Sequence, residues 1–383
     1  MSHSNTIFSQ ILKLVPRHEF ERLAKQHHSG RSFRTASRWS QFVMLTLAQL
    51  SGRLSLRDIV ENTAAQIHRL YHLGSVILSR SNLSRINEGK PYTLYEALFG
   101  KLLKGCQGMA PGHQFRFNNP LYSLDASTID LCLSVFPWAD FRTTKGAIKL
   151  HVGLNHGGYL PEFVTVTDGK AADISIGRTL KFPKGSMVAV DWAYNDYAWY
   201  KQLTEKGIFF VTRLKSHAIF RVVERRPVLA AKGLTCDQTI EFTGALTAKK
   251  CPIAMRRIRY RDPQTGKHYV FLTNNFKLAA RTIADIYKSR WQVELFFKWV
   301  KQNLKIKSFI GTSKNAVMTQ IWIALCVYLM LAFIKFQSKL KKSMQQILHL
   351  LQLNLFEKRD LTALLRGDPP PNHQPNINQM ALL

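Results

Sequence analysis

The sequence has few acidic residues, and this shortage narrows the classes of protein it can represent. Its 383 residues include only 24 Asp and Glu against 54 Lys and Arg, which gives a formal net charge of +30. So much positive charge repels itself in a compact chain and is best tolerated when the partner is a polyanion. Because the excess is spread along the chain, nucleic acid fits better than a membrane surface. A generic basic surface is the alternative interpretation.

Cysteine is also scarce, and its spacing excludes two common uses. The five cysteines are odd in number, far apart and form no C-x-x-C pair. Neither a disulfide framework nor a structural zinc site is therefore expected. The first ten residues have no apolar signal core, so secretion is not expected either. We expect a reducing, cytoplasmic setting.

Long apolar runs and nucleotide-binding motifs are missing as well. The longest apolar run, Ile321–Ile334, is 14 residues, whereas a membrane span needs ~20. This run predicts a buried core helix and no membrane partner. The sequence contains neither G-x-S-x-G nor a P-loop, so neither a serine nucleophile nor an ATP-driven reaction is indicated.

Basic residues gather in two separate stretches. Residues 1–120 hold 16 Lys and Arg against 6 Asp and Glu, and residues 213–277 hold 14 against 4. Two such stretches indicate a long contact with nucleic acid rather than one basic tail.

The first part of the chain, residues 1–115, is predicted to be a helical DNA-binding domain. Amphipathic stretches surround Phe42–Leu50 and Leu56–Tyr71, and a turn at Gly74 precedes the polar, Arg-containing stretch Ser79–Arg85. Such a stretch suits the second helix of a helix–turn–helix, which lies in the DNA major groove. A helical bundle with a solvated basic face explains the same residues equally well. Residues 105–120, rich in Gly, Pro and Asn, resemble a linker.

From residue 120 the pattern indicates an α/β domain over 120–310. Short apolar runs end in turns and predict strands that make a mixed sheet flanked by helices. Residues 213–277 interrupt this domain as a β-rich insertion, and a long helix follows over about 278–304. Residues 311–365 are predicted to be helical, and 366–383 form a polar tail that we expect to be disordered. The expected strands are Leu121–Leu124, Leu131–Phe136, Leu150–Leu154, Phe163–Val166, Met187–Val190, Ile208–Val211, Ile253–Tyr260 and Tyr269–Thr273.

Two aspartates follow strand-like runs. Asp125 comes after Leu121–Leu124, and Asp191 comes after Met187–Val190. If the two strands are neighbours, both carboxylates project at one edge of the sheet. A carboxylate at such a place is costly unless it is solvated, capped or bound to a metal. The alternative is that each aspartate caps a turn or a following helix.

One face of the predicted helix over 278–304 carries a single acid among cations and aromatic rings. At 100° per residue, one arc holds Tyr287, Arg290, Trp291, Glu294, Lys298 and Lys301. The apolar stripe on the other side consists of Ile286, Val293, Phe296, Phe297, Val300 and Leu304. A phosphate-contacting face with one metal ligand fits this pattern. The alternative is a solvated helix face on which Glu294 pairs with Lys298 at i,i+4.

Three carboxylates would serve phosphodiester cleavage. The reaction needs a water activated at neutral pH and a stabilised leaving 3′ oxygen, which two divalent ions ~3.5–4 Å apart can supply together. Mg²⁺ prefers oxygen ligands and keeps several waters, so a few carboxylates suffice to hold the pair.

Several motifs resemble those of a known family. The spacing Tyr287-x2-Arg290-x3-Glu294-x6-Lys301 resembles the Y-R-E-K signature of a large group of bacterial insertion-sequence transposases. In that group two stretches surround the catalytic aspartates, and this chain has similar stretches at Leu124–Asp130 and Val190–Asn195. Phe210–Lys215 and Phe271–Asn275 resemble the edges of its β-strand insertion. The resemblance covers about residues 120–310.

The resemblance implies a ribonuclease H-like fold with an Asp-Asp-Glu triad that binds Mg²⁺ or Mn²⁺, with two ions expected. It implies cut-and-paste movement of an element bounded by inverted terminal repeats, through a hairpin intermediate and with a homodimer on paired ends. By position, Asp125, Asp191 and Glu294 would be the catalytic metal ligands. Tyr287, Arg290 and Lys301 would contact the DNA backbone, with Lys298 on the same face, and Trp291 could stack on a flipped base.

Other residues compete for these roles. Asp130, Asp168 and Asp173 are alternative carboxylates, although Asp168 precedes Gly169 and suits a turn. Trp192 and Tyr194 are weaker candidates for stacking. Two other functions stay open at this point: a catalytically inactive, transposase-derived DNA-binding protein, and a ribonuclease H-like repair nuclease.

Overall fold

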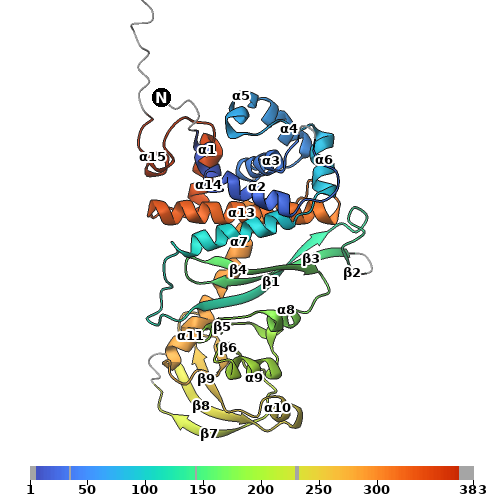
Figure 1. Ribbon diagram of the computed structural model, residues 1–383. Coiled ribbons are helices and arrows are strands. Elements are labelled where there is room, and N and C mark those ends of the chain that lie inside the picture. Colours follow the sequence, from blue (N-terminus) through green and yellow to red (C-terminus); the bar gives the residue numbers. More distant parts are fainter. Residues whose placement is uncertain (1–5, 34–35, 143–144, 229–232, 371–383) are drawn as a thin grey trace, which may run out of the picture. The chain divides into compact units, whose positions relative to one another are not determined.

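The computed structural model describes residues 6–33, 36–142, 145–228 and 233–370. The chain divides into two compact units, each described here by itself. One unit joins Met1–Met109 to Val300–Leu383, and the other is Ala110–Trp299. Figure 1 labels the elements along the chain. The expected tail, 366–383, falls largely on residues 371–383, which lie outside the described residues.

The first unit is helical where it is described. Helix α13 contacts α3, α6, α7 and α14, so helices from both ends of the sequence share one core. The helices of this unit are α1 (Ile7–Leu12), α2 (Arg17–Gln26), α3 (Arg38–Ser51), α4 (Leu56–Ala64), α5 (Ile67–Leu70), η1 (Tyr71–Leu73), α6 (Arg80–Gly89), α7 (Thr93–Gln107), α13 (Lys314–Ser338), α14 (Met344–Asn354) and α15 (Leu361–Arg366).

The apolar run Ile321–Ile334 lies inside α13 and is buried, as the sequence predicts. By length and composition alone this helix could cross a membrane, but 94% of its most apolar window is buried within the structure. The expected helix over Leu56–Tyr71 is broken, because α4 ends at Ala64 and α5 begins at Ile67. Helix α6 begins directly after Ser79, whose hydroxyl accepts a hydrogen bond from the Asn82 backbone N–H and caps the helix.

The second unit is built on one mixed sheet. Its strand order is β2-β3-β1-β5-β6-β10-β9-β8-β7, and β4 pairs with the outer side of β3. Strand β1 is antiparallel to β3 and parallel to β5, and β5 is parallel to β6. The strands are β1 (Leu121–Leu131), β2 (Asp140–Arg142), β3 (Lys145–Asn155), β4 (Leu160–Asp168), β5 (Met187–Ala189), β6 (Phe209–Arg213), β7 (Phe220–Arg226), β8 (Leu234–Phe242), β9 (Met255–Arg261) and β10 (His268–Thr273).

Two expectations about β1 are wrong. Strand β1 runs to Leu131, so Asp125 lies within the strand and not at its end. The expected strand Leu131–Phe136 does not form, because Leu131 already ends β1 and the chain then turns. The Phe136 N–H donates to the Cys132 carbonyl at 2.9 Å, which closes that turn. Pro137 follows and has no N–H to give to a sheet ladder.

Strands β7–β10 occupy the expected insertion and extend the same sheet. Strand β10 pairs antiparallel with β6, and β9, β8 and β7 follow outward. Successive residues of the central strands alternate between two apolar cores. Leu124, Val190 and Phe210 face the core that includes α9 (Tyr197–Glu205). Ala189 and Val211 face the opposite core, which includes α11 (Ala280–Ser289).

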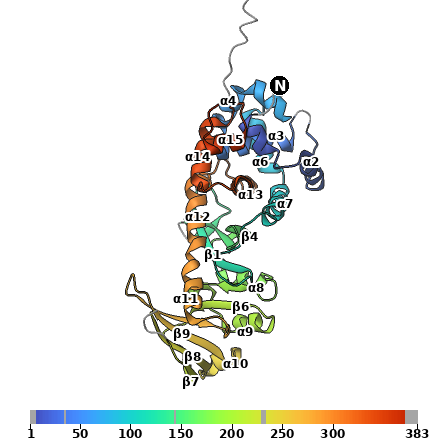
Figure 2. The ribbon, with the colours of Figure 1, turned by 90° about the vertical axis from the view of Figure 1, so that its left-hand side faces the viewer.

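The single long helix expected over 278–304 is two helices. Helix α11 ends at Ser289 and α12 (Trp291–Asn303) begins after Arg290; Figure 2 shows them as successive orange segments. At the junction the Arg290 N–H donates to the Tyr287 carbonyl and the Val293 N–H to the Arg290 carbonyl, in the tighter i,i+3 pattern. The Ser289 hydroxyl donates to the Ile286 carbonyl at 2.7 Å, a bond that bends helices. The expected apolar stripe is nevertheless buried, from Ile286 to Leu304.

Candidate active site

Three polar residues hold equivalent positions on neighbouring parallel strands. Ser123, Ala189 and Val211 are Cα partners across β1, β5 and β6. Two residues further along these strands the chain has Asp125, Asp191 and Arg213. Because side chains alternate with a period of two, Asp125 and Arg213 project from the face that Ala189 and Val211 share with α11. Asp191 lies two residues after the end of β5, and its pKa responds to Arg290 and Glu294, so it lies near the same face. The sheet register and the short segment after β5 together bring the two aspartates close.

Glu294 joins this row through Arg290. The Arg290 guanidinium lies 3.5 Å from Asp125 (Nη1 to Oδ2) and 3.5 Å from Glu294 (Nη2 to Oε1). The side chains of Arg290 and Asp125 are 12% and 13% exposed, whereas that of Glu294 is 38% exposed. Glu294 thus pairs with the residue four positions before it, whereas the sequence suggested Lys298, four positions after it. The helix junction sets the buried Arg290 between the two acids.

Asp191 has two relationships at once. Its Oδ1 accepts a hydrogen bond from the Ala193 N–H at 2.9 Å and caps the short helix η2 (Trp192–Tyr194). The capping interpretation considered from the sequence is therefore right for this bond. Burial raises the pKa of Asp191, the Ala193 N–H and Arg290 lower it, and Asp173 and Glu294 raise it. The Asp191 carboxylate is thus also within electrostatic reach of Arg290 and Glu294.

The carboxyl group of Asp125 has a strongly raised pKa. Burial, followed by the nearby charge of Glu294, raises its pKa from 3.8 to about 7, and Arg290 and the Ala126 N–H oppose this rise. Both burial and the charge of Glu294 disfavour the ionised Asp125 carboxylate, and an added cation would favour it.

The donor set suits a hard divalent cation, but the side chains now surround a guanidinium. Carboxylate oxygens are the ligands that Mg²⁺ prefers. Among the residues described, no three His, Cys, Asp or Glu side chains already converge as a ready metal cage. The Glu294 side chain is more exposed than that of Asp125 and now pairs with Arg290.

The guanidinium of Arg290 also has donor atoms that could bind an anion. Its Nε and Nη1 atoms are buried and, within the described part of the chain, have no hydrogen-bond partner. Its guanidinium lies 5.9 Å from the centre of the Tyr287 ring. Buried donors without partners are costly, and a phosphate oxygen would satisfy them with charge-assisted bonds.

A hollow of about 350 Å³ adjoins these residues. Aromatic rings and cations line it, including Arg213, Tyr269, Tyr287, Arg290 and Trp291. The Arg213 guanidinium lies 5.5 Å from the centre of the Tyr269 ring and 4.3 Å from that of Trp192. Trp192 and Trp291 are 53% and 58% exposed, which is unusual for such large rings.

The remaining predicted residues hold other positions. Lys298 is exposed and Lys301 half-buried on α12, four and seven residues after Glu294, and so on its side of the helix.

Of the competing candidates, Tyr194, Asp168 and Asp173 have structural partners. Tyr194 is 2% exposed and packs in the core beside α9. Asp168 accepts bonds from the Lys170 and Ala171 N–H groups, as a turn residue does. Asp173 lies 3.1 Å from the Lys149 ammonium, and Asp130 is exposed on β1.

Arg213 is the residue that sequence reasoning missed. The stretch Phe210–Lys215 is part of the family resemblance, but it suggested no role for the arginine. Its position at the end of a strand parallel to the one before Asp191 was the available signal, and only the pairing of β5 with β6 makes it usable.

Comparison with protein families gives two matches. Residues 117–330 match the family described as Transposase DDE domain. Residues 3–75 match a domain of unknown function, DUF4372.

Curated relatives agree with the first match. A Sinorhizobium fredii protein named as transposase y4zB is 32% identical over 295 residues, 76% of this chain and 80% of the relative. A Geobacillus stearothermophilus protein named as a transposase for insertion sequence element IS5377 is 28% identical over 341 residues, 88% of this chain and 87% of the relative. A solved piggyBac transposase synaptic complex with hairpin DNA aligns at a TM-score of 0.47 and 10% identity, over 98% of this chain and 83% of that one.

Proposed function

Since the chain belongs to the DDE transposase family, we propose that Asp125, Asp191 and Glu294 are its catalytic triad. In this proposal the protein cuts DNA at the inverted terminal repeats of an insertion sequence and joins the freed ends to target DNA. The observation that carries it is the equivalent position of Asp125 and Asp191 on neighbouring strands, with Glu294 linked to Asp125 through Arg290.

A ribonuclease H-like arrangement of the sheet is part of the proposal. The strand order β4-β3-β1-β5-β6 supports it, because three antiparallel strands come first and two strands parallel to β1 follow. Strands β7–β10 precede the helices that carry Arg290 and Glu294, and they would then be an insertion at the edge of that sheet.

The triad would hold Mg²⁺ or Mn²⁺, in two ions. Such ions would supply activation of the attacking water and stabilisation of the leaving 3′ oxygen. The high pKa of Asp125, which burial and then Glu294 raise to about 7, supports this, because binding of a cation offsets the crowded negative charge.

The basic and aromatic residues would bind the strand that is cut. The Arg290 Nε and Nη1 atoms would donate to a phosphate oxygen at the scissile bond. Tyr287, Lys298 and Lys301 would contact the backbone on the same side of α11 and α12, and Arg213 would add a further cation at the sheet edge. Water adds to the phosphorus, the bond to the 3′ oxygen breaks, and a 3′ hydroxyl and a 5′ phosphate result.

The finer proposal is cut-and-paste movement through a hairpin. The freed 3′ hydroxyl would attack the opposite strand and displace its 3′ oxygen, and the resulting hairpin would be opened by water. A base must leave the stack near the bend, and Trp291 is exposed beside the hollow that would receive it. Stacking on an aromatic ring is worth ~1–3 kcal/mol per base.

The test uses a duplex that carries the inverted repeats flanking the gene. Asp125→Asn, Asp191→Asn and Glu294→Gln should each bind this duplex like the unaltered protein and yield no cut product in Mg²⁺. A triad variant that still cuts would disprove the site assignment. An unaltered protein that binds but never nicks would favour the inactive DNA-binding alternative. Cutting by DNA structure, without joining to a target plasmid, would favour the repair nuclease.

End recognition would belong to residues 1–115. Helix α6 buries Leu83, Ile86 and Asn87 and exposes Arg80, Ser81, Ser84 and Arg85. A hollow of about 600 Å³ beside it is lined by Arg31, Phe33, Arg85 and Lys90, among others. This polar, basic face supports α6 as the helix that enters the major groove. Alanine at Arg80 and Arg85 should then weaken binding to the repeat, and unchanged binding would leave only the helical-bundle interpretation.

The protein would work as a homodimer on paired ends in the bacterial cytoplasm, at the nucleoid. Light scattering of the protein with one end duplex should give a mass of two chains and two duplexes. A complex of one chain and one duplex would contradict paired-end assembly.

A further inference from the structure

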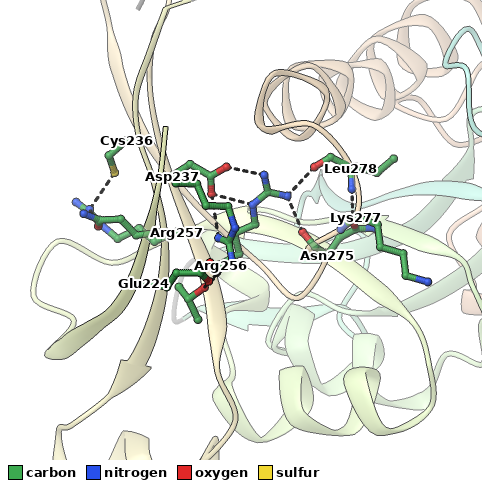
Figure 3. Close-up of polar contacts among 11 residues, drawn as sticks. Glu224, Cys236, Asp237, Arg256, Arg257, Asn275, Lys277 and Leu278 are labelled. Atoms are coloured by element: carbon green, nitrogen blue, oxygen red, sulfur yellow. Dashed lines mark hydrogen bonds and ion pairs between the residues drawn. The ribbon is translucent and has the colours of Figure 1, made fainter. Parts of the chain in front are cut away.

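A buried ion pair in the outer strands contacts the turn that leads into the catalytic helices. Arg256 of β9 and Asp237 of β8 are 4% and 6% exposed. The Arg256 Nε lies 2.9 Å from Asp237 Oδ1, and its Nη2 lies 2.6 Å from Oδ2, so the pair is bidentate. Figure 3 shows both bonds. This geometry fixes the guanidinium plane as well as its position.

The third nitrogen of Arg256 reaches out of the sheet. Its Nη1 donates to the carbonyl oxygens of Asn275 at 3.0 Å and Leu278 at 2.6 Å (Figure 3). Both carbonyls belong to the turn between β10, which ends at Thr273, and α11, which begins at Ala280. One side chain thus connects the outer strands to the start of α11.

The same turn is fixed from within. The Asn275 side-chain oxygen accepts from the N–H groups of Lys277 at 3.0 Å and Leu278 at 2.9 Å. Its neighbour Asn274 donates to the Ile208 carbonyl at 2.9 Å and accepts from the Phe210 N–H, which joins the turn to β6. The turn therefore has a defined shape before α11 starts.

Helix α11 has no side-chain cap of its own. The N-cap residue is Ala279, which has no oxygen to offer the first N–H groups. Its direction must therefore come from its buried face and from the preceding turn. The charged side chain of Arg256 donates a hydrogen bond to the Leu278 carbonyl, two residues before the helix begins.

An ion pair is not needed for packing at this place. Buried ion pairs give little net stability against apolar residues of similar volume. An apolar pair, however, cannot donate hydrogen bonds to the Asn275 and Leu278 carbonyls. The specific contribution of Arg256 is therefore the orientation of the turn before α11.

We infer that Arg256, held by Asp237, is a positioning residue that aims α11 so that Tyr287 and Arg290 reach the face of the sheet beside Asp125. This inference rests on the proposed transposase chemistry. A small change in the direction of the chain at Leu278 grows along α11, which has ten residues and is roughly 15 Å long. Loss of the Arg256 hydrogen bonds therefore displaces Arg290 more than Leu278.

The test compares three variants of the full chain. Arg256→Met combined with Asp237→Leu replaces both charges of the buried pair by apolar side chains. Arg226, which also lies 3.5 Å from Asp237, keeps its partner Glu224 in this variant. Arg256→Lys keeps the charge but lacks the planar fork that serves Asp237 and the carbonyls together. Arg257→Met is the matched control on the same strand, because Arg257 projects to the other face and contacts Gln238 and Cys236.

Three measurements separate an effect on the direction of α11 from an effect on folding. Thermal unfolding reports stability, single-turnover cleavage of saturating end duplex reports chemistry, and amide hydrogen exchange over 280–290 reports the start of α11. The double variant and Arg256→Lys should bind the duplex like the unaltered protein, cut at least about tenfold more slowly and exchange faster in α11. Arg257→Met should match the unaltered protein in all three.

Unchanged exchange in α11 together with unchanged cleavage would overturn the inference. Unfolding of both Arg256 variants under conditions where Arg257→Met stays folded would also overturn it, because the pair would then hold the strands and not aim the helix. If the unaltered protein does not cut, the proposed function fails. The exchange readout then still decides whether Arg256 orders α11.

Discussion

Arg290 Nη1 lies 3.5 Å from Asp125 Oδ2, so a buried guanidinium from the helix junction meets a buried carboxylate from the centre of the sheet. The two residues are 165 positions apart in numbering. Their contact places the stretch Tyr287–Lys301 against the sheet, and the Nε of the same guanidinium has no hydrogen-bond partner in the described part of the chain.

Removal of this guanidinium should disable cleavage more than DNA binding. We expect Arg290→Ala to lower the single-turnover cleavage rate by about 10²–10³, the usual loss when one preorganised donor to a reacting oxygen is deleted. Arg290→Lys should recover part of the rate, since it keeps the charge but not the fork. Arg281→Ala is the control, because Arg281 forms a half-exposed pair with Asp285 on the same helix. Equal losses in Arg290→Ala and Arg281→Ala would refute the special role of Arg290.

Metal-free stability should depend on Asp125 and on pH. Burial and then Glu294 raise the pKa of Asp125 from 3.8 to about 7 in the folded chain. The unfolded chain therefore loses this proton first, and the folded state is penalised increasingly as pH rises from about 4 to 7. The unfolding free energy in EDTA should fall over that range by roughly 1–4 kcal/mol, at ~1.4 kcal/mol per pKa unit. Asp125→Asn should flatten this slope in urea titrations. An unchanged slope would show that Asp125 is ionised normally.

Divalent metal should stabilise the protein and should be required for cleavage. Mn²⁺ at about 100 times its dissociation constant would add ~2.7 kcal/mol to the unfolding free energy, if it binds only the folded state. EDTA should abolish cleavage and reverse the stabilisation. Glu294→Gln should lose both responses, whereas Glu241→Gln, on β8 and paired with Arg221, should keep them. A full Mn²⁺ shift in Glu294→Gln would remove Glu294 from the metal ligands.

DNA binding should weaken steeply with salt. A protein with 54 Lys and Arg that neutralises 6–10 phosphates would lose roughly 10³–10⁵ in affinity between about 50 and 200 mM salt. Alanine at Arg80 and Arg85 should reduce the slope of log K against log salt by about two, if both contact phosphates. Arg17→Ala is the comparison, because Arg17 pairs with Glu21 on α2. A flat salt response would contradict the polyanion argument.

Trp291 should matter for hairpin formation and little for folding. Its ring is 58% exposed, so Trp291→Ala should change the unfolding free energy by no more than about 0.5 kcal/mol. First-strand nicking should proceed, while hairpin product should fall by roughly five- to a hundredfold, as the loss of one stacked base predicts. Equal hairpin yields would exclude Trp291 as the stacking residue.

The local chemistry of the site could be predicted from the sequence. Helical periodicity alone separated the buried stripe, Ile286 to Leu304, from the face with Arg290 and Glu294, and the structure confirms that burial. Periodicity failed where short-range bonds decide the outcome. It did not reveal the junction at Arg290, because the Ser289 hydroxyl bond and the i,i+3 pattern leave no mark on apolar spacing. It also placed Asp125 at a strand end, because polar residues after Leu124 hid seven more residues of β1.

The sequence by itself determined which residues carry charge and which segments repeat with helical or strand spacing, since both are properties of neighbours along the chain. Only the tertiary structure decided that Arg213 lies in one row with Asp125 and Asp191, and that Arg256 holds the turn before α11. These relationships depend on strand register and on hydrogen bonds between distant segments. Such pairings are chosen by the free energy of the whole packed sheet, and no local pattern encodes them.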